Sequence, residues 1–274
     1  MKKLYFIILL CLGTAFSQIN QPYPPVNLVS LPTAGTLPRG YFAFENLFTK
    51  DGGVLPKFSL GVTDNLTIGM SYGIQNFIGD GDLIKNRDYP EIQLKYRVYE
   101  ESETMPAMVI GIDTQGKGEY FENYTYQFTN PTDGEETTVV KEINRYEQKA
   151  LGVYFVVSRN WEALGNFGFH VGLNKSINED SDGDDDINLF FGFDKELNRS
   201  FSIFGEYNFA RDDDGIVNAN DFIMRKGNGY LNAGLRWSAT PDLMLEINFN
   251  DLAKNNRISN GVNRELKIIY FEQF

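Results

Sequence analysis

The sequence predicts an all-β fold: a transmembrane, antiparallel, up-and-down β-barrel of about 12 strands, preceded by a Pro-rich periplasmic arm. Three observations predict it. Apolar and polar residues alternate in many short segments, short and long polar connections alternate between these segments, and the chain ends on Phe274 directly after a strand-like segment. We therefore expect a signal peptide (1–17), a Pro-rich arm (18–40) and an outer-membrane β-barrel (41–274).

The first 17 residues have the organisation of a secretory signal peptide. Two lysines follow Met1, residues 4–12 are apolar, and residues 15–17 (Ala-Phe-Ser) form a small-x-small cleavage motif. The chain's one cysteine, Cys11, lies in this segment. We expect the mature chain to be exported and free of cysteine, which excludes a disulfide framework.

Residues 18–40 hold five of the chain's ten prolines, at positions 22, 24, 25, 32 and 38. Proline lacks the backbone N–H that a strand ladder needs, so this segment cannot pair regularly along most of its length. We expect an extended arm. Three arrangements stay open from the sequence: the arm runs along the periplasmic rim, folds into the lumen as a plug, or is a flexible leader.

The expected strands show an apolar–polar alternation of period two. Residues 66–73 (Leu-Thr-Ile-Gly-Met-Ser-Tyr-Gly) place four large apolar side chains on one face and four small or polar residues on the other. We find an even number of such segments, twelve, whose apolar positions are Phe42/Phe44/Phe48, Phe58/Leu60/Val62, Leu66/Ile68/Met70/Tyr72, Ile92/Leu94/Tyr96/Val98, Met108/Ile110/Ile112, Leu151/Val153/Phe155/Val157, Phe167/Phe169/Val171/Leu173, Ile187/Leu189/Phe191/Phe193, Phe201/Ile203/Tyr207/Phe209, Leu231/Ala233/Leu235/Trp237, Leu243/Leu245/Ile247/Phe249 and Leu266/Ile268/Tyr270/Phe274.

The connections between these segments alternate in length, as in outer-membrane barrels with short periplasmic turns and long outer loops. Short turns are expected at 63–65, 100–104, 160–164, 195–199 and 239–242. Longer connections are expected on the other side at 49–55, 74–88, 114–146, 174–186, 211–228 and 251–263. This arrangement places both termini in the periplasm and the protein in the cell outer membrane.

A soluble secreted β-sandwich or barrel is the alternative, because any antiparallel sheet with one buried face alternates in the same way. The apolar phase favours the membrane, since it is nearly free of charged residues, with Glu272 as the exception. Aromatic residues also gather at the ends of the apolar phase, where interfacial girdles lie: Phe42, Phe48, Tyr72, Trp161, Trp237, Phe249 and Tyr270.

The polar phase of the strands is expected to line the lumen. The candidate lumen-lining residues are Lys57, Lys95, Arg97, His170, Glu206, Arg236, Glu246 and Lys267. Charged lumen positions tune permeation, so these residues would form the selectivity lining of a pore. The same inward phase also holds bulky residues that would seal the lumen if the barrel is not a pore, namely Tyr154, Phe190, Phe204, Tyr230 and Met244.

The composition excludes several classes of function. The 25 Lys and Arg against 37 Asp and Glu give a formal net charge of −12, which argues against nucleic acid as a partner. One histidine and one cysteine leave no Cys/His metal site, and we expect no cofactor. His170 is the only histidine to serve as base of a lipid hydrolase, and its inward phase points it away from lipid. We therefore expect that this protein is not an enzyme.

The acidic loop 178–186 offers alternate carboxylates around a Gly turn, as in the first half of a calcium-binding EF-hand loop. The pattern then fails, because the twelfth position from Asn178 is Leu189 and the neighbouring segments are strand-like rather than helical. Weak divalent-ion binding and an ordinary solvated loop remain the two interpretations, and no metal ligands are assigned.

The arm and the first hairpin carry a family resemblance. Residues 27–42 (Asn-Leu-Val-Ser-Leu-Pro-Thr-Ala-Gly-Thr-Leu-Pro-Arg-Gly-Tyr-Phe) resemble the opening of the YjbH-like outer-membrane family, with its Pro-Ser/Thr-Ala stretch and following Gly. Residues 60–69 resemble the family's first hairpin, and residues 150–161 its strand ending in Ser-Arg/Lys-x-Trp. The similarity covers residues 26 to about 210 and implies a barrel associated with exopolysaccharide production or export.

Two functions follow as hypotheses. The first is a non-enzymatic outer-membrane β-barrel that assists assembly, secretion or surface retention of an extracellular polysaccharide. Its partners would be outer-membrane lipid and a polysaccharide or periplasmic export proteins contacted by the Pro-rich arm. The alternative is a small-solute pore with a mixed-charge lumen.

Overall fold

A computed structural model of the chain describes residues 25–79, 81–129, 135–162, 164–213, 226–256 and 261–274. The expected signal peptide (1–17) and the start of the arm (18–24) lie outside the described residues. Within the described ranges, no helix has the length and apolar character needed to cross a membrane. The helical elements described are the single turns η1 (Lys50–Gly52) and η2 (Arg211–Asp213).

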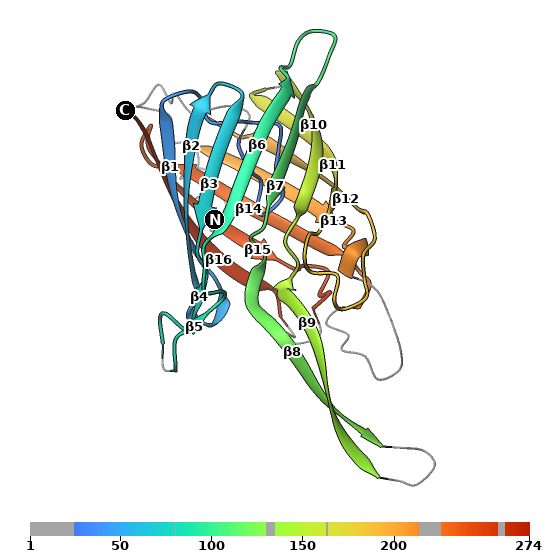
Figure 1. The fold of residues 1–274 in the computed structure, drawn as a ribbon. Coiled ribbons are helices and arrows are strands. Elements are labelled where there is room, and N and C mark those ends of the chain that lie inside the picture. The colour runs from blue at the N-terminus through green and yellow to red at the C-terminus, as the bar shows by residue number, and fades with distance from the viewer. Residues whose placement is uncertain (1–24, 80, 130–134, 163, 214–225, 257–260) are drawn as a thin grey trace, which may run out of the picture.

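Twelve strands pair with their neighbours in chain order and close into a barrel (Figure 1). The sheet closes because β1 pairs antiparallel with both β2 and the last strand, β16. The predicted twelve-stranded, antiparallel, up-and-down barrel is thus confirmed. Its strands are β1 (Tyr41–Phe48), β2 (Val54–Thr63), β3 (Leu66–Ser71), β6 (Glu91–Tyr99), β7 (Ala107–Asp113), β10 (Gly152–Glu162), β11 (Asn166–Lys175), β12 (Asn188–Glu196), β13 (Phe201–Asn208), β14 (Tyr230–Ser238), β15 (Leu243–Asn250) and β16 (Asn263–Gln273).

The connections divide the barrel into two ends (Figure 1). Short links follow β2, β6, β10, β12 and β14, and we call this side the turn end. The longer links follow β1, β3, β7, β11, β13 and β15, and we call this side the loop end. Each link lies within a few residues of the position predicted from the sequence. The link between β14 and β15, for example, spans residues 239–242 as expected.

Two of the expected loops contain further strands. The connection after β3 includes the two-residue strands β4 (Ile74–Gln75) and β5 (Ile84–Lys85). The segment 114–146, expected as a loop, instead forms most of a two-stranded ribbon of β8 (Lys117–Thr129) and β9 (Glu136–Gln148) that projects from the loop end (Figure 1). Aromatic residues in β8 and β-branched residues in β9 favour strands there, although this ribbon has no membrane to cross.

The barrel is polar inside and apolar outside. Met70 and Ile92 on the outward phase are 55% and 59% exposed, whereas the inward Glu246 is fully buried. A water-soluble barrel buries its apolar phase, and only a lipid environment makes the opposite arrangement stable. The exterior is therefore that of a membrane-spanning barrel of the outer-membrane type.

Aromatic rings gather on the outer surface near both ends of the barrel. Toward the turn end, Phe42 lies 5.8 Å from Phe58 between ring centroids, and Phe201 stacks on Trp237 at 6.4 Å. Toward the loop end, Tyr207 meets the ring of Phe209 edge-on. Such rings are favoured at the membrane–water interfaces, and their positions agree with the predicted aromatic girdles.

Candidate functional site in the plugged lumen

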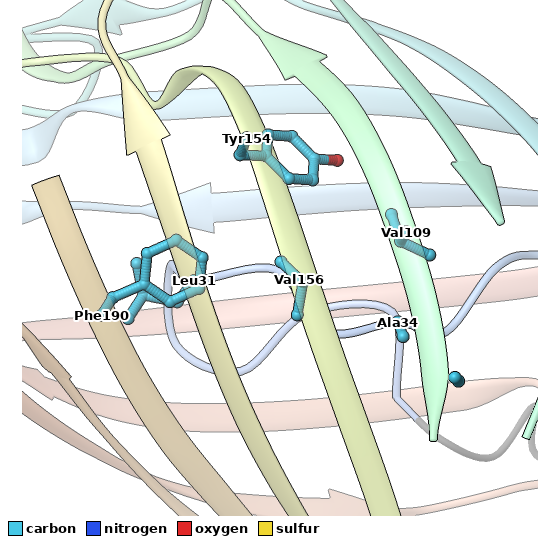
Figure 2. Packing of buried hydrophobic residues seen from close by; sticks show 7 residues of the cluster. Leu31, Ala34, Val109, Tyr154, Val156 and Phe190 are labelled. Carbon is cyan, nitrogen blue, oxygen red and sulfur yellow. The ribbon is translucent and has the colours of Figure 1, made fainter. Parts of the chain in front are cut away.

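The lumen is occupied by the arm. Residues 25–37 lie inside the barrel, where Leu31 is 2% and Ala34 is 0% exposed (Figure 2). Backbone hydrogen bonds from Gly40 to Gly61 and from Phe274 to Gly40 fix the arm at the turn end. Of the three arrangements that the sequence left open, the structure shows the plug.

The arm doubles back within the lumen. A bridge joins Asn27 to Pro32, and the N–H of Leu28 donates to the carbonyl of Leu31 at 2.9 Å. Leu31 packs against Phe190 and Tyr154, toward the loop end of the barrel. The arm therefore passes most of the way through the lumen and turns there.

Apolar side chains of the arm fill pockets between inward residues of the wall. Leu28 and Val29 pack on Phe204, while Leu37 packs beside Met244. Wall glycines provide the necessary space, since a Cβ at Gly192 would collide with Leu28. Four of the five bulky residues predicted to seal the lumen, Tyr154, Phe190, Phe204 and Met244, share a buried cluster with arm residues; the fifth, Tyr230, is also buried and lies near the loop end.

Glu206 on β13 holds the turn of the arm. Its buried carboxylate accepts hydrogen bonds from the backbone N–H groups of Ser30 and Leu31, at 3.0 and 2.9 Å, and from the Ser30 hydroxyl at 2.5 Å. Asn232 on β14 donates a further bond at 2.7 Å. A carboxylate that accepts several N–H donors is well compensated for its burial, so this is a strong anchor.

Lys95 on β6 holds the arm on both sides of its turn. Its ammonium group donates to the carbonyls of Val26, Gly35 and Thr33 at 2.6, 3.3 and 3.4 Å. All three acceptors belong to the arm. In the closed barrel this lysine therefore binds the plug rather than facing an open channel.

A third anchor is an ion-paired group on β14, β15 and β16. Glu246 lies between Arg236 and Lys267, with shortest N···O distances of 2.6 and 3.1 Å. Each cation also donates to an arm carbonyl, Arg236 to Asn27 at 3.2 Å and Lys267 to Val29 at 3.1 Å. Glu246 thus offsets part of the charge of the two cations, and both cations still bind the arm's main chain.

His170 lies at the centre of a hydrogen-bonded chain that reaches the arm. Its Nδ1 is 2.7 Å from the Ser158 hydroxyl, and its Nε2 is 2.8 Å from Asp194. The Ser158 hydroxyl in turn accepts the N–H of Ala34 at 2.8 Å. A hydroxyl, an imidazole and a carboxylate in this order resemble a hydrolase triad. The serine oxygen, however, accepts the N–H of Ala34 from the arm. The arrangement therefore serves to hold Ala34 in place.

The two remaining predicted residues behave differently. Lys57 lies 3.9 Å from Asp113 and lines a small lumen cavity of about 120 Å³ beside the arm. Arg97 lies at the turn end, where it donates to the Asp64 carbonyl at 2.9 Å and to the Asn65 side chain. The structure thus brings Lys95, Glu206, Arg236, Lys267 and, through Ser158, His170 onto the arm, and leaves Arg97 at the rim.

Sequence reasoning did not single out Ser158, Asp194 or Asn232. Each is a polar residue of the inward phase, but such residues are common on every strand of a barrel. A second signal was available in the small inward residues Ser59, Gly61 and Thr67, since small side chains leave room for an object in the lumen. Leu37 donates its N–H to Thr67, and the arm carbonyl of Pro38 lies directly over Gly61.

A group of charged residues covers the loop end. Arg145 of β9 pairs with Asp182 at 2.6 Å and with Asp213 at 2.7 Å, and Lys149 pairs with Asp182 at 2.9 Å. Burial, together with the neighbouring Asp213, raises the pKa of Asp212 to about 7. Among the described residues, no group of three or more side chains could hold a metal ion. The acidic loop is here tied by ion pairs to β9 and its following segment.

The comparisons with known proteins concern the fold alone. No protein-family model matches the sequence, and no curated protein matches it. Among solved structures, the chain is similar to the KdgM porin with 8% identity and a TM-score of 0.47, over 84% of this chain and 98% of that one. It is similar to the NanC porin with 11% identity and a TM-score of 0.41, over 84% and 99% of the chains.

An outer-membrane protein of Acinetobacter baumannii, Omp33, is similar with 8% identity and a TM-score of 0.41, over 85% of this chain and 97% of that one. Identities this low carry no functional residues from one chain to the other. The barrel architecture of this chain follows from its own strand pairing.

Proposed function

We propose that this protein is an outer-membrane channel for small solutes whose lumen is closed at rest by its own arm, residues 25–40. The turn end and both termini face the periplasm in this proposal, and the loop end faces outward, as in barrels with short periplasmic turns. Displacement of the arm opens the path. We further propose that the barrel is not an enzyme.

The observation that carries the proposal is the way in which the wall holds the arm. Glu206, Lys95, Arg236 and Lys267 bind the arm through its backbone N–H and C=O groups. Water or a polar solute can form hydrogen bonds with these charged side chains in place of the arm's main chain. The same residues that hold the plug would therefore form a hydrated, mixed-charge channel lining once the arm leaves.

The test compares the full mature chain with a variant that lacks residues 18–38, both inserted in planar lipid bilayers. We expect low, intermittent conductance from the full chain and sustained conductance from the variant, because the deletion removes the plug. Both proteins should give a folded band in SDS that shifts on boiling. A folded deletion variant that stays silent would contradict the channel function.

A second candidate function is the assembly, secretion or surface retention of a polysaccharide. The sealed lumen favours it, because Tyr154, Phe190, Phe204 and Met244 close around the arm and leave a cavity of only about 120 Å³. The resemblance of residues 27–42 to the YjbH-like family supports the same role. In this case the barrel stays closed and the arm contacts periplasmic export partners.

Surface and extracellular polysaccharide should be measured in a deletion strain, in its parent and in a complemented strain. Loss that complementation restores would favour the polysaccharide function. Unchanged polysaccharide would remove this candidate and leave the channel.

A further inference from the structure

A hollow of about 430 Å³ lies outside the lumen at the loop end. Its walls are the segment 85–89, which precedes β6, and the base of the β8–β9 ribbon, with Asn178 of the next loop at its edge. Its volume is within the range of small-ligand sites. It is separate from the plugged lumen, and neither the channel nor the polysaccharide function uses it.

Two tyrosine rings, those of Tyr89 and Tyr120, line this hollow and are held by neighbouring side chains. The Arg87 guanidinium lies 4.5 Å from the ring centroids of both Tyr89 and Tyr120. The ring of Tyr120 meets Tyr146 edge-on at 5.0 Å, and the Tyr146 hydroxyl donates to Glu91 at 2.8 Å. The cation–π contacts hold both rings, and Tyr146, itself hydrogen-bonded to Glu91, supports Tyr120.

Glu91 completes the support from β6. Its carboxylate lies 3.4 Å from Arg87, and its buried position keeps the arginine between the rings. Tyr89 nevertheless keeps 52% of its surface exposed. The hollow thus presents the side chain of Tyr89 to solvent within a mainly polar lining.

The polar lining of the hollow has balanced charge. Lys85 and Arg87 contribute two positive charges, and Asp88 and Glu122 contribute two negative ones. Asn144 and Asn178 add side-chain amides, which both donate and accept hydrogen bonds. A strongly charged ligand would meet like charge on one wall whichever sign it carried. A neutral ligand with many hydroxyl groups would meet complementary groups throughout.

We propose that this hollow binds a neutral saccharide, whose apolar ring face packs on the tyrosines while its hydroxyls bond to the amides and carboxylates. Aromatic rings offer a large, rigid surface at low entropic cost, which suits them to this role. Binding here requires no movement of the arm, so it does not depend on the proposed channel.

The test is calorimetric titration of the full mature chain with maltohexaose, cellohexaose and, as a charged probe, a hexamer of galacturonate. The protein is kept in lauryldimethylamine oxide micelles, because a maltoside detergent would itself compete with the probes. We expect saturable binding of at least one neutral hexamer and weaker binding of the charged one. No binding of either neutral hexamer, or tighter binding of the charged hexamer, would overturn the proposal.

Two variants localise the site. Tyr89→Ala removes one of the two tyrosine rings that line the hollow, and we expect affinity for the neutral hexamer to fall about tenfold. Asn178→Gly, at an exposed position whose backbone φ of 62° glycine adopts without strain, should lower affinity several-fold. The matched control is Tyr99→Ala, since Tyr99 is 56% exposed at the opposite end of β6. Unchanged affinity in Tyr89→Ala, or equal loss in Tyr99→Ala, would refute this location.

The same variants separate this inference from the channel. Tyr89→Ala should leave the conductance of the plug-deleted barrel unchanged, because the hollow lies outside the lumen. If the plug-deleted barrel conducts but the protein does not bind saccharide, only the proposed saccharide site is refuted. If the protein binds saccharide but the plug-deleted barrel does not conduct, only the channel function is refuted.

Discussion

Replacement of Glu206 by alanine should loosen the plug. The carboxylate accepts two backbone N–H groups of the arm, from Ser30 and Leu31, at 3.0 and 2.9 Å. A hydrogen bond to a charged group contributes about 1.5–3 kcal/mol, so these two bonds together contribute about 3–6 kcal/mol. The Ser30 hydroxyl also donates to this carboxylate, so the two backbone bonds give a lower figure for the total loss.

The loss of these two hydrogen bonds predicts how much the fraction of open barrels increases. Each 1.4 kcal/mol changes an equilibrium tenfold, so the lower figure predicts an open probability on the order of 100-fold higher. Glu206→Gln keeps the side chain's shape and one acceptor oxygen but loses the charge. We expect this variant to raise the open probability by roughly tenfold. Single-channel recording in planar bilayers measures both effects directly.

The matched control is Glu265→Gln. Glu265 is also a buried carboxylate, but it pairs with Lys117 at 3.1 Å and lies near the loop end. The Glu265→Gln substitution should leave the open probability near that of the unchanged protein. If Glu206→Ala is folded and opens no more often than the Glu265 variant, the reasoning that the wall's charges hold the arm is wrong.

Three further predictions follow from the same geometry. Ser158→Ala leaves the buried N–H of Ala34 without its acceptor, which costs about 1–3 kcal/mol, so open probability should rise in bilayers but less than in Glu206→Ala. In a barrel lacking residues 18–38, Lys95→Glu should shift the reversal potential toward cation preference, and an unshifted potential would place Lys95 off the conducting path. Because the folded pKa of Asp212 is raised from 3.8 to about 7, the folded protein binds this proton more tightly, so its stability falls as pH rises from about 4 to 7. The melting temperature of Asp212→Asn should therefore fall less between pH 4 and pH 7 than that of the unchanged protein. An equal fall in both proteins would show that the titration of Asp212 is not the cause.

The alternation of apolar and polar residues was sufficient to predict the barrel. In residues 92–98 the outward positions are apolar and the inward ones polar or charged, and β6 forms there with Ile92 exposed and Lys95 buried. This pattern is local, since the side chains of a strand alternate between faces whatever its neighbours are. The β8–β9 ribbon lies in a segment predicted as a long polar connection and was not predicted in this way.

The path of the arm could not be predicted in this way. Its proline content excludes a regular strand, but plug, rim segment and flexible leader share that property. What decides is the contact between Ser30 and Glu206, which are 176 residues apart in the chain. Such a contact depends on the closure of the whole barrel and on the space left inside it.

The sequence by itself determined the strand number, the two ends and the phase that faces lipid, because period-two alternation and connection length are properties of neighbouring residues. Only the tertiary structure decided that Lys95, Glu206 and Arg236 bind the arm, and that Ser158, His170 and Asp194 join across three strands. The physical reason is the register of the strands: it sets which inward side chains lie at the same height, and therefore which of them can reach the arm together.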